Sequence, residues 1–92
     1  MNFQWDEHNE AKLASHGVNP DEAVDVFYEN HIELPAYAVN GETRNDIVGR
    51  TSEGRVLLVA YTLRGELIRV VNSFTPSRVE IQALKRRYPD AK

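Results

Sequence analysis

The sequence predicts a single α+β domain, residues 1–92, with two N-terminal helices and a C-terminal helix packed on a three- to four-stranded antiparallel sheet. Three observations predict this fold class. Helix-start signals precede helically spaced apolar residues near both ends of the chain. Three strand-like segments lie between them, separated by tight-turn signals. The length of 92 residues suits one domain with one modest core.

Two helices are expected before residue 31. The first begins at Asp6-Glu7 and runs to about Ser15, because Gly17 is suited to a helix C-terminus. The second follows Asn19, an apt N-cap, with Pro20 in the first turn and Glu22 placed to complete a capping box. It ends near residue 30.

The central half of the chain predicts the sheet. Residues 31–39 are an edge strand or an irregular connection, because Pro35 lacks a backbone N–H to donate. Asn40-Gly41 is a strong turn signal, and strands follow at 42–51, 55–63 and 66–74. A last helix begins after Ser77, whose capping box includes Glu80, and runs to about residue 88.

The turn lengths predict a register. A three-residue loop at 52–54 pairs Arg50 with Val56, and a two-residue turn at 64–65 pairs Ala60 with Arg69. Side chains alternate between the two faces of a strand. The main core face is then expected to hold Ile47, Leu57, Val59, Tyr61, Ile68, Val70 and Phe74, and the other face Glu42, Arg44, Asp46, Arg50 and Arg69.

Composition limits the class of protein. The chain has no cysteine, which excludes disulfides and thiolate metal sites and fits a reducing cytoplasm. No apolar run approaches the roughly 18–20 residues that span a bilayer, and the polar, acidic start is unlike a signal peptide. The net charge of −3 and pI near 5.5 disfavour a general nucleic-acid binder. Most bases nevertheless lie after residue 49, which permits a local basic face.

Several motifs together resemble a known family. They are W-D-E at 5–7, H-G-V-N-P-D-E-A at 16–23, G-R-T-S-E-G-R at 49–55, I-R-V-V at 68–71 and S-R-V-E at 77–80. In this order and spacing they resemble the BrnT family, small toxins of bacterial toxin–antitoxin pairs with a RelE-like ribonuclease fold. The resemblance implies a cytoplasmic endoribonuclease that inhibits translation, cuts RNA without a metal or other cofactor, and is silenced by a BrnA-type antitoxin.

The chain also departs from the family pattern. Ser15 stands where the family typically has lysine, and Lys12 where it has asparagine. Phe74 and Thr75 stand where it typically has one or two arginines near the active site. Among the matching positions, the resemblance places functional charges at Glu42, Arg50 and Arg69.

Metal-free RNA cleavage needs a base for the 2′-hydroxyl, cations for the phosphorane and an acid for the leaving oxygen. Glu42 is the first candidate base and His16 the second. Arg50 and Arg69 are expected to hold phosphate, because guanidinium groups form paired hydrogen bonds to it. Further candidate RNA contacts are Arg44, Arg78, Lys85, Arg86 and Arg87.

Each candidate also has a structural interpretation. Arg50 and Arg69 can form cross-strand ion pairs with Asp46 or Glu42, and Glu42 can be an ordinary surface acid. His16 and the basic residues at 85–87 favour the dipoles of the helices that they end.

Two alternatives to an active enzyme follow. The first is a catalytically degenerate BrnT-like fold that acts as a protein-binding module, favoured by Ser15, Phe74, Thr75 and the acidic pI. The second is a homodimer formed through the sheet edge near Pro35.

Overall fold

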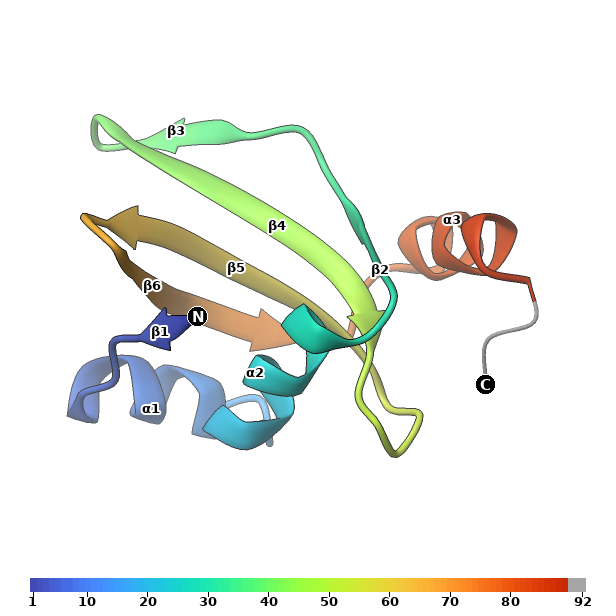
Figure 1. Cartoon of the computed structure of the whole chain (residues 1–92), viewed down its shortest axis with the longest axis horizontal. Helices are drawn as coiled ribbons and strands as arrows, with labels where there is room; N and C mark the ends of the chain where they lie inside the picture. The colour runs from blue at the N-terminus through green and yellow to red at the C-terminus, as the bar shows by residue number, and fades with distance from the viewer. Residues whose placement is uncertain (90–92) are drawn as a thin grey trace.

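The computed structural model describes residues 1–89 and shows helices packed on a mixed, mostly antiparallel sheet (Figure 1). The strand order is β1-β6-β5-β4-β2, and β3 also pairs with β4. The elements are β1 (Asn2–Phe3), α1 (Glu7–Ala14), α2 (Pro20–Tyr28), β2 (His31–Glu33), β3 (Tyr37–Val39), β4 (Glu42–Arg50), β5 (Val56–Arg64), β6 (Leu67–Phe74) and α3 (Arg78–Arg87). The α+β prediction is confirmed. The sheet has six strands because β1 adds in parallel to β6 and the ambiguous segment 31–39 forms two short strands.

All three helices begin where local chemistry predicts. Asp6, Asn19 and Ser77 are the N-caps, and each belongs to a complete capping box. In α1 the Asp6 carboxylate accepts from the backbone N–H groups of His8 and Asn9. Gly17 then adopts φ +69°, the left-handed conformation that lets the chain turn away after α1.

The register is confirmed between β4 and β5 and wrong between β5 and β6. Arg50 pairs with Val56, as predicted. The second turn, however, is Gly65-Glu66, so Arg64 pairs with Leu67 and Arg69 lies opposite Thr62 instead of Ala60. Gly65 belongs to both the predicted turn, 64–65, and the observed turn, 65–66. In the observed turn it is the first of the two residues, with φ +61°. A shift of two residues preserves the face of each side chain, so Arg69 stays on the predicted face.

A bulge in β6 corrects the predicted position of Phe74. Tyr61 pairs with Val70, whereas Ala60 pairs with Asn72, so Val71 is an extra residue. The extra residue reverses the side-chain alternation beyond it. Phe74 therefore pairs with Leu58 and leaves the main core face for the opposite one.

The sheet is covered unequally on its two faces. Helices α1 and α2 cover the main face, whose buried residues are Leu13, Val18, Ala23, Val26, Ile47, Leu57, Val59 and Val70. On the other face, Leu84 of α3 packs with Val48, Leu58 and Ala60. Because α1 and α3 lie at opposite ends of the molecule, α3 leaves the α1 end of this second face open (Figure 1).

Gly49 lets α2 and β2 approach β4 closely. A Cβ atom at this position would lie 2.7 Å from the Cβ of His31 and 2.9 Å from the carbonyl oxygen of Asn30. Glycine is therefore required here by space. Within residues 1–89, no helix is long and apolar enough to cross a membrane.

Candidate functional site

A cleft of about 680 Å³ lies between α1 and the open part of the second sheet face. Its cationic side chains come from four different elements: Lys12 from α1, Arg44 from β4, Arg64 from β5 and Arg69 from β6. We call this the basic cleft. His8 and Ser15 also line it, and Val71 of the β6 bulge contributes apolar surface.

Helix and strand geometry bring these side chains together. His8, Lys12 and Ser15 follow one another at intervals of four and three residues, so they lie on one face of the helical segment. The buried Asn9 fixes α1 to the sheet, since its Nδ2 donates to the carbonyl oxygens of Val70 at 3.0 Å and Gln4 at 2.9 Å. The helix therefore holds its polar face beside the arginine-bearing strands.

Arg69 forms an ion pair with Asp6. Its Nη1 lies 2.9 Å from Oδ2 of Asp6, and its Nη2 lies 3.3 Å from Oδ1. The hydrogen bond from Arg69 and those from the backbone of the helix start lower the pKa of Asp6 below its ordinary value of 3.8. The alternative of a cross-strand ion pair of Arg69 with Asp46 or Glu42 is therefore not what the structure has. A carboxylate from the N-cap of α1 takes their place.

Glu42 lies between two arginines of the basic cleft. Its Oε1 accepts from Nε of Arg44 at 3.2 Å. Its Oε2 accepts from Nε of Arg64 at 3.1 Å and lies 3.1 Å from Nη2 of the same guanidinium group. Partial desolvation opposes ionisation of Glu42, but these hydrogen bonds outweigh it, and the pKa falls below its ordinary value of 4.5. A carboxylate held in this way is a weak proton acceptor near neutral pH. Its evident role is to position the two guanidinium groups.

The basic cleft keeps an excess of positive charge. Of its four cations, which include Lys12, the guanidinium groups of Arg44, Arg64 and Arg69 form ion pairs with two carboxylates, those of Asp6 and Glu42, and the charge of Asp46 also acts on Arg44, which leaves one positive charge. Among residues 1–89, Lys12 has no carboxylate partner. A phosphodiester carries one negative charge, so the balance favours its binding here.

Asp46 lies two residues from Arg44 on the same face of β4. Burial raises the pKa of Asp46, the nearby charge of Glu80 adds to the effect, and the hydrogen bond from the Tyr37 hydroxyl at 2.9 Å opposes it. A carboxyl group whose pKa is raised is a better proton acceptor than Glu42, whose pKa is lowered. Asp46 therefore joins the candidates for proton transfer.

His16 lies just beyond the basic cleft. It follows Ser15, is exposed, and its ring lies 5.6 Å from that of Phe74, tilted by 54°. His16, which belongs to one of the motifs shared with the family, and Phe74, which departs from the family pattern, are thus neighbours in space. An aromatic ring occupies the place where the family pattern has a cation.

Other predicted site residues lie away from the basic cleft. Arg50 is six residues along β4 from Arg44, about 20 Å at 3.3 Å per residue. Arg78, Lys85, Arg86 and Arg87 are exposed on α3, at the opposite end of the molecule from α1 (Figure 1). The Arg87 guanidinium lies 4.6 Å from the centre of the Tyr88 ring. The structure brings Arg44, Arg69 and Glu42 together and leaves these others outside.

Lys12, Arg64 and His8 were not assigned to the site from the sequence. The sequence did contain a signal for Lys12 and His8, because these residues and Ser15 are spaced to lie on one face of a helix. Arg64 was assigned to a turn, because the register placed it one residue beyond its strand. Within residues 1–89, no group of three histidine, aspartate or glutamate side chains is arranged to hold a metal ion.

Comparison with protein families gives a match over most of the chain. Residues 5–80 match the model of the ribonuclease toxin BrnT of type II toxin–antitoxin systems. A comparison with individually curated proteins gave no match. The matched segment begins at Trp5 and includes the basic cleft, His16 and the start of α3. Since it spans well over half of the chain, this protein belongs to the BrnT family of ribonuclease toxins of type II toxin–antitoxin systems.

Proposed function

We propose that this chain is an endoribonuclease that binds the scissile phosphate of RNA in the basic cleft and cleaves it without a metal ion. The observation that carries the proposal is the cleft itself, where four cations outnumber the carboxylates in a member of a ribonuclease toxin family. Expected consequences are inhibition of translation in the bacterial cytoplasm and neutralisation by a BrnA-type antitoxin.

The reaction is an attack of the RNA 2′-hydroxyl on the adjacent phosphorus. The 2′-oxygen forms a bond to phosphorus, its proton passes to a base, and the 5′-oxygen of the next nucleotide leaves and takes up a proton. The products are a 2′,3′-cyclic phosphate and a 5′-hydroxyl. Arg44 and Arg64 stabilise the charge on the phosphorane, held in position by Glu42.

Proton transfer is assigned by position. His16 stands at the end of the basic cleft, and histidine is the side chain most often used for general acid–base catalysis. Asp46, on the face of Arg44, is the alternative base because burial raises its pKa. Glu42 was the first candidate base from the sequence, but it is paired with two arginines, so in this proposal it positions them and does not take up the proton.

A second candidate function is a protein-binding module that has lost catalysis. The position of Phe74 beside His16 favours it, because an apolar ring contributes nothing to phosphate binding where the family pattern has arginine. The ion pairs of Arg44, Arg64 and Arg69 point the same way, since a phosphate must compete with Glu42 and Asp6 for them.

The test is incubation of the purified chain, free of antitoxin, with a labelled single-stranded RNA in the presence of EDTA and, in a separate reaction without EDTA, with translating ribosomes. The proposal predicts fragments that end in 2′,3′-cyclic phosphate. Intact RNA in both reactions would contradict it. The F74R/T75R double variant separates the two candidates, because cleavage by that variant alone indicates a degenerate site on a competent fold.

A further inference from the structure

A surface on the main sheet face, on the side away from the basic cleft, is aromatic and incompletely covered. Phe3 of β1, Phe27 of α2 and Tyr61 of β5 form a row in which neighbouring ring centres are 5.1 Å apart. Each of the three rings is only partly buried. Met1, Tyr28 and Leu63 surround the row and are exposed to 65%, 59% and 61%. We call these six residues the aromatic patch.

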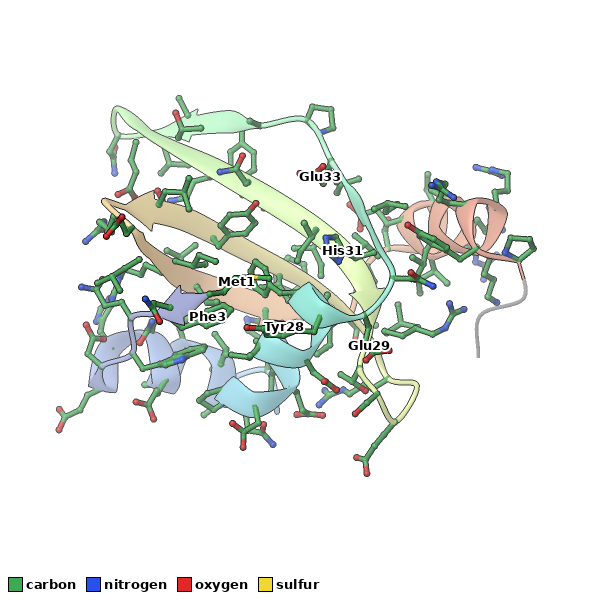
Figure 2. The ribbon with its side chains drawn as sticks, viewed as in Figure 1. Met1, Phe3, Tyr28, Glu29, His31 and Glu33 are labelled. Atoms are coloured by element: carbon green, nitrogen blue, oxygen red, sulfur yellow. The ribbon has the colours of Figure 1, made fainter. Side chains whose placement is uncertain are left out.

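Several elements build the aromatic patch. Leu63 shares a face with Tyr61 by strand alternation, and Phe3 and Leu63 both pair with Ile68 of β6. Figure 2 shows the side chains of Met1, Phe3 and Tyr28 on the side of the sheet where α2 lies. Three of the five large apolar side chains that are exposed in residues 1–89 gather here. Exposed apolar surface concentrated in this way is typical of an interaction site.

Carboxylates form one border of the aromatic patch. Glu29 and Glu33 flank it on the side of β2, with His31 between them (Figure 2). Glu33 pairs with Ile47 of β4, whose side chain belongs to the main-face core, so Glu33 shares that sheet face with Tyr61. Its charge contributes to raising the pKa of Tyr61, after the larger effect of burial. Among residues 1–89, neither Glu29 nor Glu33 has an ion-pair partner.

We propose that the aromatic patch binds an amphipathic segment of the cognate antitoxin, with aliphatic side chains on the rings and lysine or arginine beside Glu29 and Glu33. Aromatic residues are enriched where interfaces gain most of their binding free energy. The two unpaired carboxylates favour a basic segment by charge complementarity. The proposal rests on membership of a toxin–antitoxin family and is independent of whether the basic cleft cleaves RNA.

A second copy of this chain fits the aromatic patch less well. In a two-fold dimer the same patch meets itself. The patch and its border contain two carboxylates and no lysine or arginine, so a facing copy would offer Glu29 and Glu33 no cation to pair with. The net charge of −3 adds to the repulsion. The charge pattern therefore selects a basic partner.

The test measures binding of the purified cognate antitoxin to immobilised variants of this chain. Y28S/L63S removes two exposed anchors and is expected to weaken binding by at least 30-fold, as loss of a binding hot spot does. V79S is the matched control, since Val79 is 71% exposed on α3 and lies outside the patch. It is expected to change affinity less than threefold.

E29K/E33K is expected to slow association with the antitoxin about tenfold at low salt. E10K/E53K, which makes the same change of charge outside the patch, is not expected to slow it.

Three outcomes would overturn the proposal. One is unchanged antitoxin affinity in Y28S/L63S. Another is a loss of affinity confined to K12A/R64A, which would place the antitoxin on the basic cleft. The third is a dimer of the chain alone at 10 µM, by sedimentation, that Y28S/L63S dissociates. RNA cleavage by each variant is measured in parallel. The aromatic patch and the basic cleft lie on opposite sheet faces. Loss of antitoxin binding can therefore be observed separately from loss of RNA cleavage, so that the two proposals can fail independently.

Discussion

Arg69 of β6 donates two hydrogen bonds to Asp6, the N-cap of α1, at 2.9 and 3.3 Å. This pair joins the helix that forms one wall of the basic cleft to the strand that forms another. It also neutralises one of the four cations of the cleft. The side chain of Arg69 is only 12% exposed and that of Asp6 is 52% exposed, so the acid is the accessible partner.

Asp6→Asn is expected to strengthen RNA binding. Asparagine is as good an N-cap as aspartate, so α1 remains, while Arg69 loses its competing charge. We expect affinity for a 2′-O-methylated oligonucleotide, which resists cleavage, to rise about threefold at 50 mM salt and the gain to shrink as salt increases. D21N, an exposed acid of α2, is the control in the same anisotropy measurement. Weaker binding by D6N would show that the ion pair itself supports the site.

Stability is expected to fall in acid and to be level from pH 5 to 7. In the folded chain the pKa values of Asp6, Glu22 and Glu42 lie below their ordinary values of 3.8, 4.5 and 4.5. Groups with lowered pKa stabilise the fold fully above their unfolded pKa values and lose that contribution as the pH falls through the folded ones. Urea midpoints measured between pH 2.5 and 7 test this. A decline that begins above pH 5 would contradict it.

Asp46→Asn is expected to stabilise the chain at pH 7. Burial raises the pKa of Asp46, so the charged form is disfavoured in the fold and its contribution turns unfavourable as the pH rises through the folded pKa. Asparagine is uncharged and still accepts from the Tyr37 hydroxyl. The expected gain is about 0.5 kcal/mol, or roughly 2–4 °C in Tm. A gain at pH 3, where both residues are neutral, would point to another cause.

Arg55→Ala is expected to destabilise the fold without affecting RNA binding. Nη1 of Arg55 donates to both carboxylate oxygens of Glu22 and to the carbonyl of Gly17, each at 2.9 Å, and so ties the β4–β5 loop to the start of α2. The partners are partly exposed, so we expect a loss of about 1 kcal/mol and a Tm lower by about 4–8 °C. Calorimetry of R55A beside R78A, an exposed arginine without such contacts, measures this loss. Equal Tm values would exclude the role.

Local signals in the sequence predicted most of the fold. Caps and tight turns depend on a few adjacent residues, which is why Asp6, Asn19 and Ser77 were assigned as helix starts. The β5–β6 turn was misplaced because Gly65 suits either of two overlapping turns. The bulge at Val71 was not predicted, because no local signal in the sequence marks it.

The candidate site was only partly predictable for the same reason. Strand alternation placed Arg44, Arg69 and Glu42 on one face. Other contacts of the site are distant in sequence: Asp6 reaches Arg69 across 63 residues, and Lys12 enters the cleft because Asn9 fixes α1 to Val70. These contacts depend on where α1 packs against the sheet, and the hydrophobic periodicity of the sequence does not reveal that position.

The claim that RNA binds in the basic cleft is tested most directly by the salt dependence of oligonucleotide binding to K12A/R64A and to R86A/R87A. Both double variants remove two exposed cations, one pair in the cleft and the other at the far end of α3. We predict that K12A/R64A weakens binding at least tenfold and reduces the slope of log K against log salt by about 1.4, or 0.7 per lost contact. R86A/R87A is predicted to change affinity less than threefold. A tenfold loss in R86A/R87A with wild-type affinity in K12A/R64A would contradict this account.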